Sequence, residues 1–325
     1  MNGPEKREIR VGLVGAGNIA QVAELPALAA EPGVTIAGMV TQSEESARHN
    51  LARWPVERAY GSIEEMIAEA RLDALFVLTP KYIHTPFVEL GLTSGLDVFC
   101  EKPLSTSLKE ARYVADLSDQ TGQLLMVAFN RRYSEVYRLA RQHFGDGHPQ
   151  FCVAQKNRSG SEYRATLENA IHMIDLLRWF CGEPEQVTAH TIAPDSYQED
   201  GTMALIRFNT GSIGTLVASR TAGEWDERLD AHGGLTSVRV TAPDTVAISQ
   251  GGETRLVEMR PRAFGWAQAT VTMGFAPEVS HFVECVRERR RPLTDGHEAV
   301  RTQELVEEIL KQAGLPLDDR AGVRQ

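Results

Sequence analysis

The fold of this chain is predicted by one stretch near its start, I-R-V-G-L-V-G-A-G-N-I-A, residues 9–20. The first half is a short apolar β run, and the second half matches G-x-G-x-x-A at a strand-to-helix junction. Gly15 permits a tight turn, Gly17 lets the backbone approach a pyrophosphate, and the small Ala20 allows close helix packing. The loop is completed by Ala16, Asn18 and Ile19. Because a helix start offers unpaired N–H groups, we expect residues 15–19 to bind a dinucleotide.

Outward from this stretch, strand and helix patterns alternate. We expect further strands at residues 34–40, 74–78, 97–100 and 124–129, with helices near 63–70, 84–94 and 107–121. Alternation of this kind is typical of βαβ units with parallel strands. The sequence therefore predicts an α/β fold that begins with a doubly wound parallel sheet, a Rossmann domain, over residues 1–129.

The pattern changes after residue 130. Alternating strand patterns follow at residues 151–156, 186–192, 202–208, 212–220, 229–232 and 237–241, with shorter runs to Met259. Most of them are joined without an intervening helix, which predicts a second α/β domain, residues 130–325, with a large open and mostly antiparallel sheet. One face of such a sheet can be buried while the other meets a partner. The last helices, residues 277–289 and 296–313, are expected to pack back on the first domain.

Length and composition agree with two domains. A chain of 325 residues exceeds what one hydrophobic core usually organises. The formal charge is −10 and the basic residues are scattered, which argues against nucleic acid or an anionic membrane as a partner. We find neither a span of about 20 apolar residues nor a signal peptide, so we expect a cytoplasmic protein. The four cysteines have no metal-binding spacing, and we expect reduced thiols, no disulfide and no metal site.

The end of the second strand bears on the choice of dinucleotide. Thr41-Gln42-Ser43 stands where an NAD-specific protein usually has an Asp or Glu for the ribose 2′-hydroxyl. Without that carboxylate a 2′-phosphate is not repelled, and Thr41 and Ser43 could donate hydrogen bonds to it. Arg48 is either a clamp for the phosphate or an ordinary surface charge. We expect NAD or NADP, with a slight preference for NADP.

Two polar segments end buried strands. In V-F-C-E-K-P, residues 98–103, the proline keeps Lys102 out of the α region, so Lys102 should lie on extended backbone at the carboxyl end of a strand. Ligands bind at that edge of an open α/β sheet. In T-P-K-Y-I-H, residues 79–84, His84 either lies near the nicotinamide ribose or caps the start of a helix.

A helix predicted over residues 167–180 carries polar residues in register. Its apolar stripe is Leu167, Ile171, Ile174 and Leu177. A different face presents Glu168, His172, Asp175 and Trp179, at i, i+4, i+7 and i+11. That face is either part of a reaction site or the side of a helix wedged between two layers, with His172 satisfied by Asp175.

Five motifs in order give this sequence a resemblance to a known family. They are the glycine loop of residues 15–20, Thr79-Pro80 with His84, Glu101-Lys102-Pro103, Asn130-Arg131-Arg132, and His172 with Asp175. Together they resemble the Gfo/Idh/MocA oxidoreductases over nearly the whole chain. Residues 156–159 and 274–285 look nearest to the branch labelled MviM-like.

The resemblance implies hydride transfer between NAD(P) and a hydroxyl-bearing carbon of a sugar, polyol or related small molecule. It implies an active site between the two domains and a homodimer or homotetramer formed through the second domain's sheet. Lys102 matches the family's catalytic lysine, and His172 matches the histidine that assists it. Glu168 stands where the family often has an Asp, so the third member of the catalytic set differs here.

Further site residues follow from the same resemblance. The implied cofactor contacts beyond residues 15–19 and Thr41 are Thr79, Pro80, His84, Glu101, Lys102 and Asn130. Lys102, His172, Asp175 and Arg158 are the implied substrate contacts. Near an oxidised nicotinamide we expect the pKa of Lys102 to fall toward neutrality, which would suit a general base.

Two other functions use the same architecture. One is an NAD-assisted hydrolase or lyase, which oxidises its sugar substrate transiently and recovers the hydride. The other is a non-catalytic NAD(P)-binding regulatory protein. The presence of both Lys102 and His172 favours the dehydrogenase or reductase, because a regulatory protein needs neither.

Overall fold

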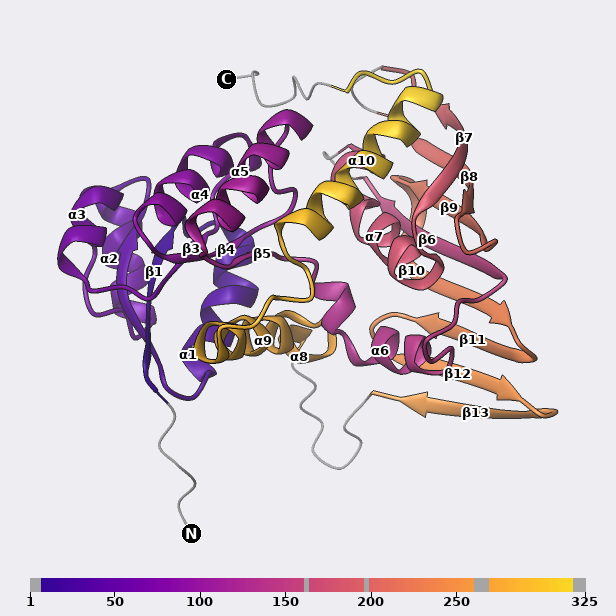
Figure 1. Cartoon of the computed structure of the whole chain (residues 1–325), viewed down its shortest axis with the longest axis horizontal. Coiled ribbons are helices and arrows are strands. Elements are labelled where there is room, and N and C mark those ends of the chain that lie inside the picture. Colours follow the sequence, from indigo (N-terminus) through magenta and orange to yellow (C-terminus); the bar gives the residue numbers. More distant parts are fainter. Residues whose placement is uncertain (1–6, 161–163, 196–198, 260–268, 318–325) are drawn as a thin grey trace, which may run out of the picture. The chain divides into compact units, whose positions relative to one another are not determined.

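The computed structural model describes residues 7–160, 164–195, 199–259 and 269–317, which form two compact units (Figure 1). Unit 1 comprises the described residues of Met1–Ala128 and Phe275–Val300, and unit 2 those of Phe129–Gly274 and Arg301–Gln325. The sequence assigned residues 130–325 to a second domain, with the last helices packing back on the first. In the structure, residues 275–300 belong to unit 1.

The centre of unit 1 is a sheet of five parallel strands. They are β1 (Ile9–Val14), β2 (Val34–Val40), β3 (Ala74–Val77), β4 (Asp97–Cys100) and β5 (Leu125–Val127). Their order is β2-β1-β3-β4-β5, so the predicted doubly wound parallel sheet is confirmed. The chain reverses its winding direction between β1 and β3, and such a switch point opens a crevice at the carboxyl ends of the strands.

Helices join these strands. They are η1 (Ala20–Glu24, one π-helical turn), α1 (Leu25–Ala30), α2 (Glu44–Arg53), α3 (Ile63–Glu69), η2 (Lys81–Ile83), α4 (His84–Thr93) and α5 (Leu108–Thr121). Ser43, Ser62 and Ser107 start α2, α3 and α5, and each hydroxyl accepts a hydrogen bond from the N–H three residues on. These caps satisfy amide donors that the first turn of a helix leaves unpaired.

A helix from the end of the chain completes the core of unit 1. Helix α9 (Phe275–Glu288) places Phe282 against two sheet residues, with ring centroids 5.5 Å from Phe76 and 5.6 Å from Phe99. The rings of Phe76 and Phe99 stack at 4.7 Å. All three side chains are fully buried. Unit 1 thus needs a segment nearly 200 residues away in sequence to close its apolar face.

Unit 2 is built on a sheet of eight strands. They are β6 (Phe151–Ser159), β7 (Pro184–Ile192), β8 (Gly201–Phe208), β9 (Ile213–Ser219), β10 (Thr221–Gly233), β11 (Thr236–Thr241), β12 (Thr245–Gln250) and β13 (Glu253–Glu258). The order is β13-β12-β11-β10-β6-β9-β8-β7, and only β6 and β9 pair in parallel. The prediction of a large, mostly antiparallel sheet is confirmed.

Helices cover one face of this sheet. The helical segments of unit 2 are η3 (Asn130–Tyr133), α6 (Glu135–Gln142), η4 (Ala165–Asn169), α7 (Ile171–Cys181), α8 (Ala269–Thr272) and the greater part of α10 (Gly296–Gln312). Helix α7 packs on β6 and β9, and α6 packs on β11 and β12. Strand β8 buries alternate residues toward this layer and exposes the others, as a sheet covered on one side requires.

Two properties of the chain as a whole can be checked against the structure. Within the described parts, no helix has both the length and the hydropathy of a membrane-spanning segment. The four cysteines are buried free thiols. Burial raises the pKa of the Cys100 thiol, so this cysteine is held in its unreactive protonated form.

Candidate active site

The glycine loop has the geometry that a dinucleotide needs. Gly15 has φ +93°, and a Cβ there would lie 2.6 Å from the carbonyl oxygen of Leu78. A Cβ on Gly17 would meet no atom within 4 Å, so the backbone at this position faces open space. The strand β1 before the loop is buried, whereas Gly17, Asn18 and Ile19 are exposed. One glycine therefore allows the turn, and the other leaves the helix start accessible to a phosphate.

The loop after β3 lies at the same edge of the sheet. Its Thr79 has a buried hydroxyl that finds no hydrogen-bond partner among the described residues. An orphaned buried hydroxyl is costly unless a ligand or water satisfies it. Together with the open backbone at Gly17, it shows that the residues present fit a bound dinucleotide.

Lys102 follows the carboxyl end of β4. Glu101 continues the sheet pairing by one bond, from its N–H to the carbonyl of Val77 at 3.0 Å. The Lys102 N–H then donates to the Glu101 carboxylate at 3.1 Å, and the Lys102–Pro103 peptide is cis. Lys102 is partly exposed. Because the ends of β1, β3 and β4 share one edge, the structure brings Lys102 together with the glycine loop and Thr79.

His84 does not have the exposure of a ligand-binding residue. Its ring is 1% exposed, with Nδ1 2.8 Å from the carbonyl oxygen of Pro103 and Nε2 2.8 Å from that of Thr79. Burial lowers the pKa of His84, outweighing the two carbonyl contacts that raise it, and the charges of Lys102 and Lys81 lower it further. The structure places His84 as the first residue of α4, with both ring nitrogens directed at backbone carbonyls.

The hydroxyls after β2 are also engaged within the protein. Thr41 donates to the carbonyl of Ser43 at 3.0 Å, and the Ser43 hydroxyl accepts from the N–H of Ser46 at 3.2 Å. Ser43 thereby caps the start of α2. Arg48 is exposed on that helix. The segment lacks the carboxylate of an NAD-specific site, and its hydroxyls already have local hydrogen bonds.

One residue of unit 1 was not singled out from the sequence. Glu24 is fully buried in η1, and neither carboxyl oxygen has a hydrogen-bond partner among the described residues. Burial, and then the negative charge of Glu101, raises the pKa of Glu24 well above its ordinary value. The available signal was a single acid within an otherwise apolar run, residues 22–30.

In unit 2, His172 lies in the first turn of α7. The side chain is 7% exposed and its Nδ1 is buried. The predicted face that joins Glu168 to His172 differs from the observed one, because η4 is a π-helical turn that ends before α7 begins. The Ala170 N–H bonds to the carbonyl of Ala165, five residues back. This wider turn shifts Glu168, which is partly exposed, out of the α-helical register with His172.

Asp175 is held by residues other than His172. Its two carboxyl oxygens accept hydrogen bonds from the guanidinium of Arg132, at 2.8 and 2.7 Å. The hydroxyl of Thr302, on α10, donates to the same carboxylate at 2.9 Å. Asp175 is completely buried. The structure therefore ties α7 to η3 and α10 through this carboxylate, where the resemblance implied a substrate contact.

A second buried ion cluster forms around Glu227. Glu227 accepts both a two-point hydrogen bond from Arg131, each at 2.9 Å, and a contact from Lys156 at 3.0 Å. The Tyr137 hydroxyl donates to it at 2.9 Å. Burial alone would raise the pKa of Glu227, but the charges of Arg131 and Lys156 outweigh burial and hold it well below its ordinary value. Two cations share this one carboxylate, and all three side chains are buried, so both cations are engaged within unit 2.

Asn130 and Arg158 differ in their availability. The Asn130 amide donates to the Met273 carbonyl at 2.9 Å and accepts from Arg131 at 3.1 Å. Both hydrogen bonds of the Asn130 side chain lie within unit 2, whereas the resemblance implied that this residue contacts the cofactor. Arg158, near the end of β6, is partly exposed and makes no hydrogen bond or ion pair with the described residues. Within the described part of the chain, its guanidinium is therefore available to a ligand.

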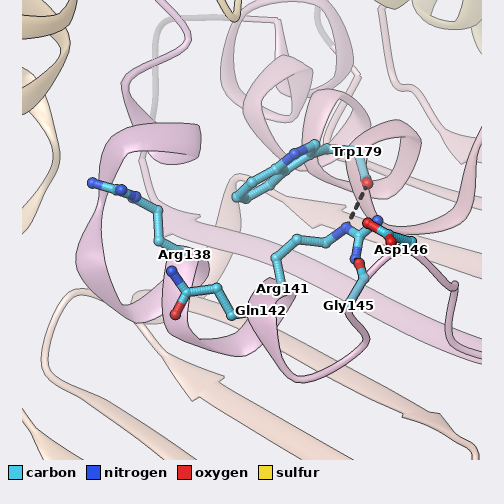
Figure 2. A pocket seen from close by; sticks show the side chains of 6 residues that line it. All are labelled: Arg138, Arg141, Gln142, Gly145, Asp146 and Trp179. Carbon is cyan, nitrogen blue, oxygen red and sulfur yellow. Dashed lines mark hydrogen bonds between the residues drawn. The ribbon is translucent and has the colours of Figure 1, made fainter.

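A pocket of about 350 Å³ lies in unit 2 between α6 and the last turns of α7 (Figure 2). Its lining is Arg138, Arg141, Gln142, Gly145, Asp146 and Trp179. Arg141 crosses the floor, donating to the carbonyls of Trp179 at 3.1 Å and Gly145 at 2.9 Å. Trp179, predicted on the same helix face as His172, is therefore part of a different cavity. Among the residues that the structure describes, no group of His, Cys, Asp and Glu could hold a metal ion.

Two models of one protein family match this chain. Residues 9–129 match the description "oxidoreductase family, NAD-binding Rossmann fold" of the Gfo/Idh/MocA proteins, and residues 132–239 match the C-terminal domain of the same family. An oxidoreductase of Salmonella typhimurium, YceM, is 28% identical over 94% of this chain and 99% of its own. Inositol 2-dehydrogenase of Rhizobium meliloti is 24% identical over 90% and 93%. A solved oxidoreductase from Agrobacterium radiobacter, in complex with NAD+, superposes with a TM-score of 0.84 at 19% identity, covering 94% of this chain and 96% of that one.

Proposed function

The chain belongs to the Gfo/Idh/MocA family of oxidoreductases, and we propose that it transfers a hydride between NAD(P) and a hydroxyl-bearing carbon of a sugar, polyol or sugar derivative. The observation that carries the proposal is the shared sheet edge in unit 1. There the open backbone of Gly17, the orphaned hydroxyl of Thr79 and the partly exposed Lys102 all follow carboxyl ends of parallel strands.

The bound nicotinamide supplies the hydride chemistry, so the chain has to position the substrate and move one proton. Lys102 is the proposed proton carrier. It takes the proton of the substrate hydroxyl during oxidation and returns it to the carbonyl oxygen during reduction. The Lys102 backbone is fixed by the pairing of Glu101 with β3 and by the hydrogen bond to the Glu101 carboxylate. A group held in this way loses little entropy when the substrate binds.

His172 and Glu168 are proposed to serve the substrate. His172 holds the reacting oxygen, and its place in the first turn of a buried helix fixes its ring. Glu168 is partly exposed on the π-helical turn and accepts from other hydroxyls of a polyol. Asp175 then acts indirectly, because its ion pair with Arg132 anchors α7 and so the backbone that carries His172.

The substrate class is proposed from charge and from relatives. Arg131 and Lys156 are buried against Glu227, whereas Arg158 is a partly exposed guanidinium near the end of β6. A neutral sugar or polyol needs no more positive charge than this. Inositol 2-dehydrogenase among the relatives acts on a polyol, which supports the same class for this chain. For the cofactor we propose NADP over NAD, because the loop after β2 lacks a carboxylate.

The test is turnover with and without Lys102. The wild-type protein is screened for absorbance change at 340 nm with NAD or NADP and a panel of sugars, polyols and sugar nucleotides. With the best substrate, Lys102→Ala should lower kcat by about 100-fold or more, the scale of lost general acid–base catalysis, while cofactor affinity is retained. Lys109→Ala, an exposed lysine on α5, is the matched control and should leave kcat unchanged. Undiminished turnover by Lys102→Ala would exclude the assigned role.

A further inference from the structure

Two loops that face the proposed cofactor site are joined by one buried side chain. Thr79 follows β3, and Pro103 is the residue after Lys102 on the loop that follows β4. His84, the first residue of α4, reaches both, with each ring nitrogen 2.8 Å from a backbone carbonyl oxygen. The ring is 1% exposed, so water does not compete for these contacts.

We propose that His84 is a positioning residue, which fixes the Lys102 loop through the Pro103 carbonyl and ties it to the Thr79 loop. We call the two ring contacts of His84, to the carbonyls of Pro103 and Thr79, the His84 clamp. This inference rests on the proposed function, because the clamp would hold Lys102 in position for its proposed role. It does not make His84 a cofactor ligand. The ring acts on the reaction only through the backbone positions of Pro103 and Thr79.

The protonation state of the His84 ring decides how many hydrogen bonds the ring can donate. Carbonyl oxygens only accept hydrogen bonds, and a neutral imidazole donates from one nitrogen. The neutral ring therefore binds one loop fully, and the protonated ring binds both. The charges acting on the ring are Lys81, in η2, and Lys102 itself, and both disfavour the second proton. On α5, the Glu110 carboxylate accepts a hydrogen bond from Ser105 at 2.8 Å and lies 2.9 Å from the Thr85 hydroxyl.

A neighbouring hydrogen bond provides a control for the general stability of the loop. The Thr85 hydroxyl, next to His84, donates to Ser105 at 3.0 Å and lies 2.9 Å from the Glu110 carboxylate. It holds the same loop two residues beyond Pro103, without touching the carbonyl of Pro103 or Thr79. Thr85→Val is thus a matched control that removes a hydrogen bond here and leaves the His84 clamp in place.

The experiment measures the reactivity of Lys102 directly. Full-length protein is labelled with limiting acetic anhydride at constant pH, and acetylation of Lys102 is quantified by mass spectrometry relative to Lys311, which is exposed on α10. His84→Leu removes both contacts. Because a released loop opens more often, Lys102 labelling should rise about fivefold, the equivalent of one hydrogen bond. Thr85→Val should leave it near the wild-type value.

Two polar variants test the two hydrogen bonds of the clamp separately. His84→Asn places an amide N–H near the position of Nδ1 and keeps the bond to Pro103, whereas His84→Gln places one near Nε2 and keeps the bond to Thr79. We expect His84→Asn to label like wild type and His84→Gln to label like His84→Leu. If His84→Leu fails to fold, the Asn and Gln variants alone decide the question.

Equal Lys102 labelling in wild type and in the folded Gln and Leu variants would overturn the clamp. So would a rise in Thr85→Val as large as that in His84→Gln. Neither readout involves turnover, so failure of the clamp and failure of the proposed dehydrogenase activity are separate results.

Discussion

At the scale of single residues, Glu24 is an acid in a place that suits a neutral group. It is fully buried, without a hydrogen-bond partner for either carboxyl oxygen among the described residues, and Glu101 adds negative charge. The pKa of Glu24 is therefore raised, so the folded protein keeps this proton to a higher pH than the unfolded chain does. In the unfolded chain the same carboxyl ionises above about pH 4.3. The folded state then binds more protons than the unfolded state, so stability falls as pH rises from that value toward the raised pKa.

Glu24→Gln removes this titration at nearly the same size. Below about pH 4, where glutamate is protonated in both states, the variant should be as stable as wild type. At pH 8 we expect it to melt several degrees higher. Thermal melts followed by circular dichroism across this range are the measurement. Glu45→Gln, exposed in α2, is the control and should show no pH-dependent gain. A Glu24→Gln advantage that is the same at every pH would contradict the buried neutral acid.

At the scale of elements, the two glycines of the turn between β1 and η1 are expected to serve different purposes, one for folding and one for binding. Gly15 needs its positive φ and lies too close to the Leu78 carbonyl for a side chain, whereas Gly17 has open space around it. Gly15→Ala should therefore lower the midpoint of urea unfolding. Gly17→Ala should leave the midpoint unchanged and weaken NAD(P) binding, because the added methyl group fills the space for the pyrophosphate. Equal destabilisation by the two substitutions would show that the loop has no such division.

How far the sequence predicts these elements depends on the range of the interaction. Strands β1 and β2 were predicted to the residue, because their apolar runs end at glycine or polar turns. Strand β10 was predicted only over residues 229–232, although it spans Thr221–Gly233, because the charged residues of its first half hide the alternation. The π-helical turn at residues 165–169 was missed, since its residues also match an α-helical period.

In the candidate site too, features set by neighbouring residues could be predicted, and contacts between distant residues could not. The glycine loop and Lys102 are local signals, each fixed by the residues beside it. The hydrogen bonds of Asp175 come from Arg132, 43 positions earlier, and from Thr302, 127 positions later. Nothing in the helix pattern around Asp175 carries that information, so the sequence offered only His172 or a substrate as its partner. Partners chosen by tertiary packing had to be found in the structure.

At the scale of the whole molecule, we propose that copies of the chain associate through the face of the unit 2 sheet that points away from its described helices. Strand β8 alternates buried residues with exposed ones, and Met203 and Leu205 are 56% and 55% exposed. Val217, on the neighbouring strand β9, pairs with Met203. Exposed apolar residues gathered on a sheet face are typical of an interface between protein chains.

Light scattering coupled to size-exclusion chromatography tests this surface. Wild type should elute as a dimer or tetramer, and the double variant Met203→Asp with Leu205→Asp should shift to a smaller species. Arg207→Asp, next on the exposed side of β8, changes charge without removing an apolar side chain and serves as the control. A wild-type protein that is monomeric at micromolar concentration would contradict the proposal.

The central claim concerns the whole chain as a nicotinamide-dependent oxidoreductase. Its most direct test is calorimetric titration of the wild-type protein with NAD+, NADH, NADP+ and NADPH in turn. The account predicts saturable binding with one site per chain, tighter for the NADP pair, and weaker binding by Gly17→Ala. No binding of any of the four by the folded wild-type protein would contradict it.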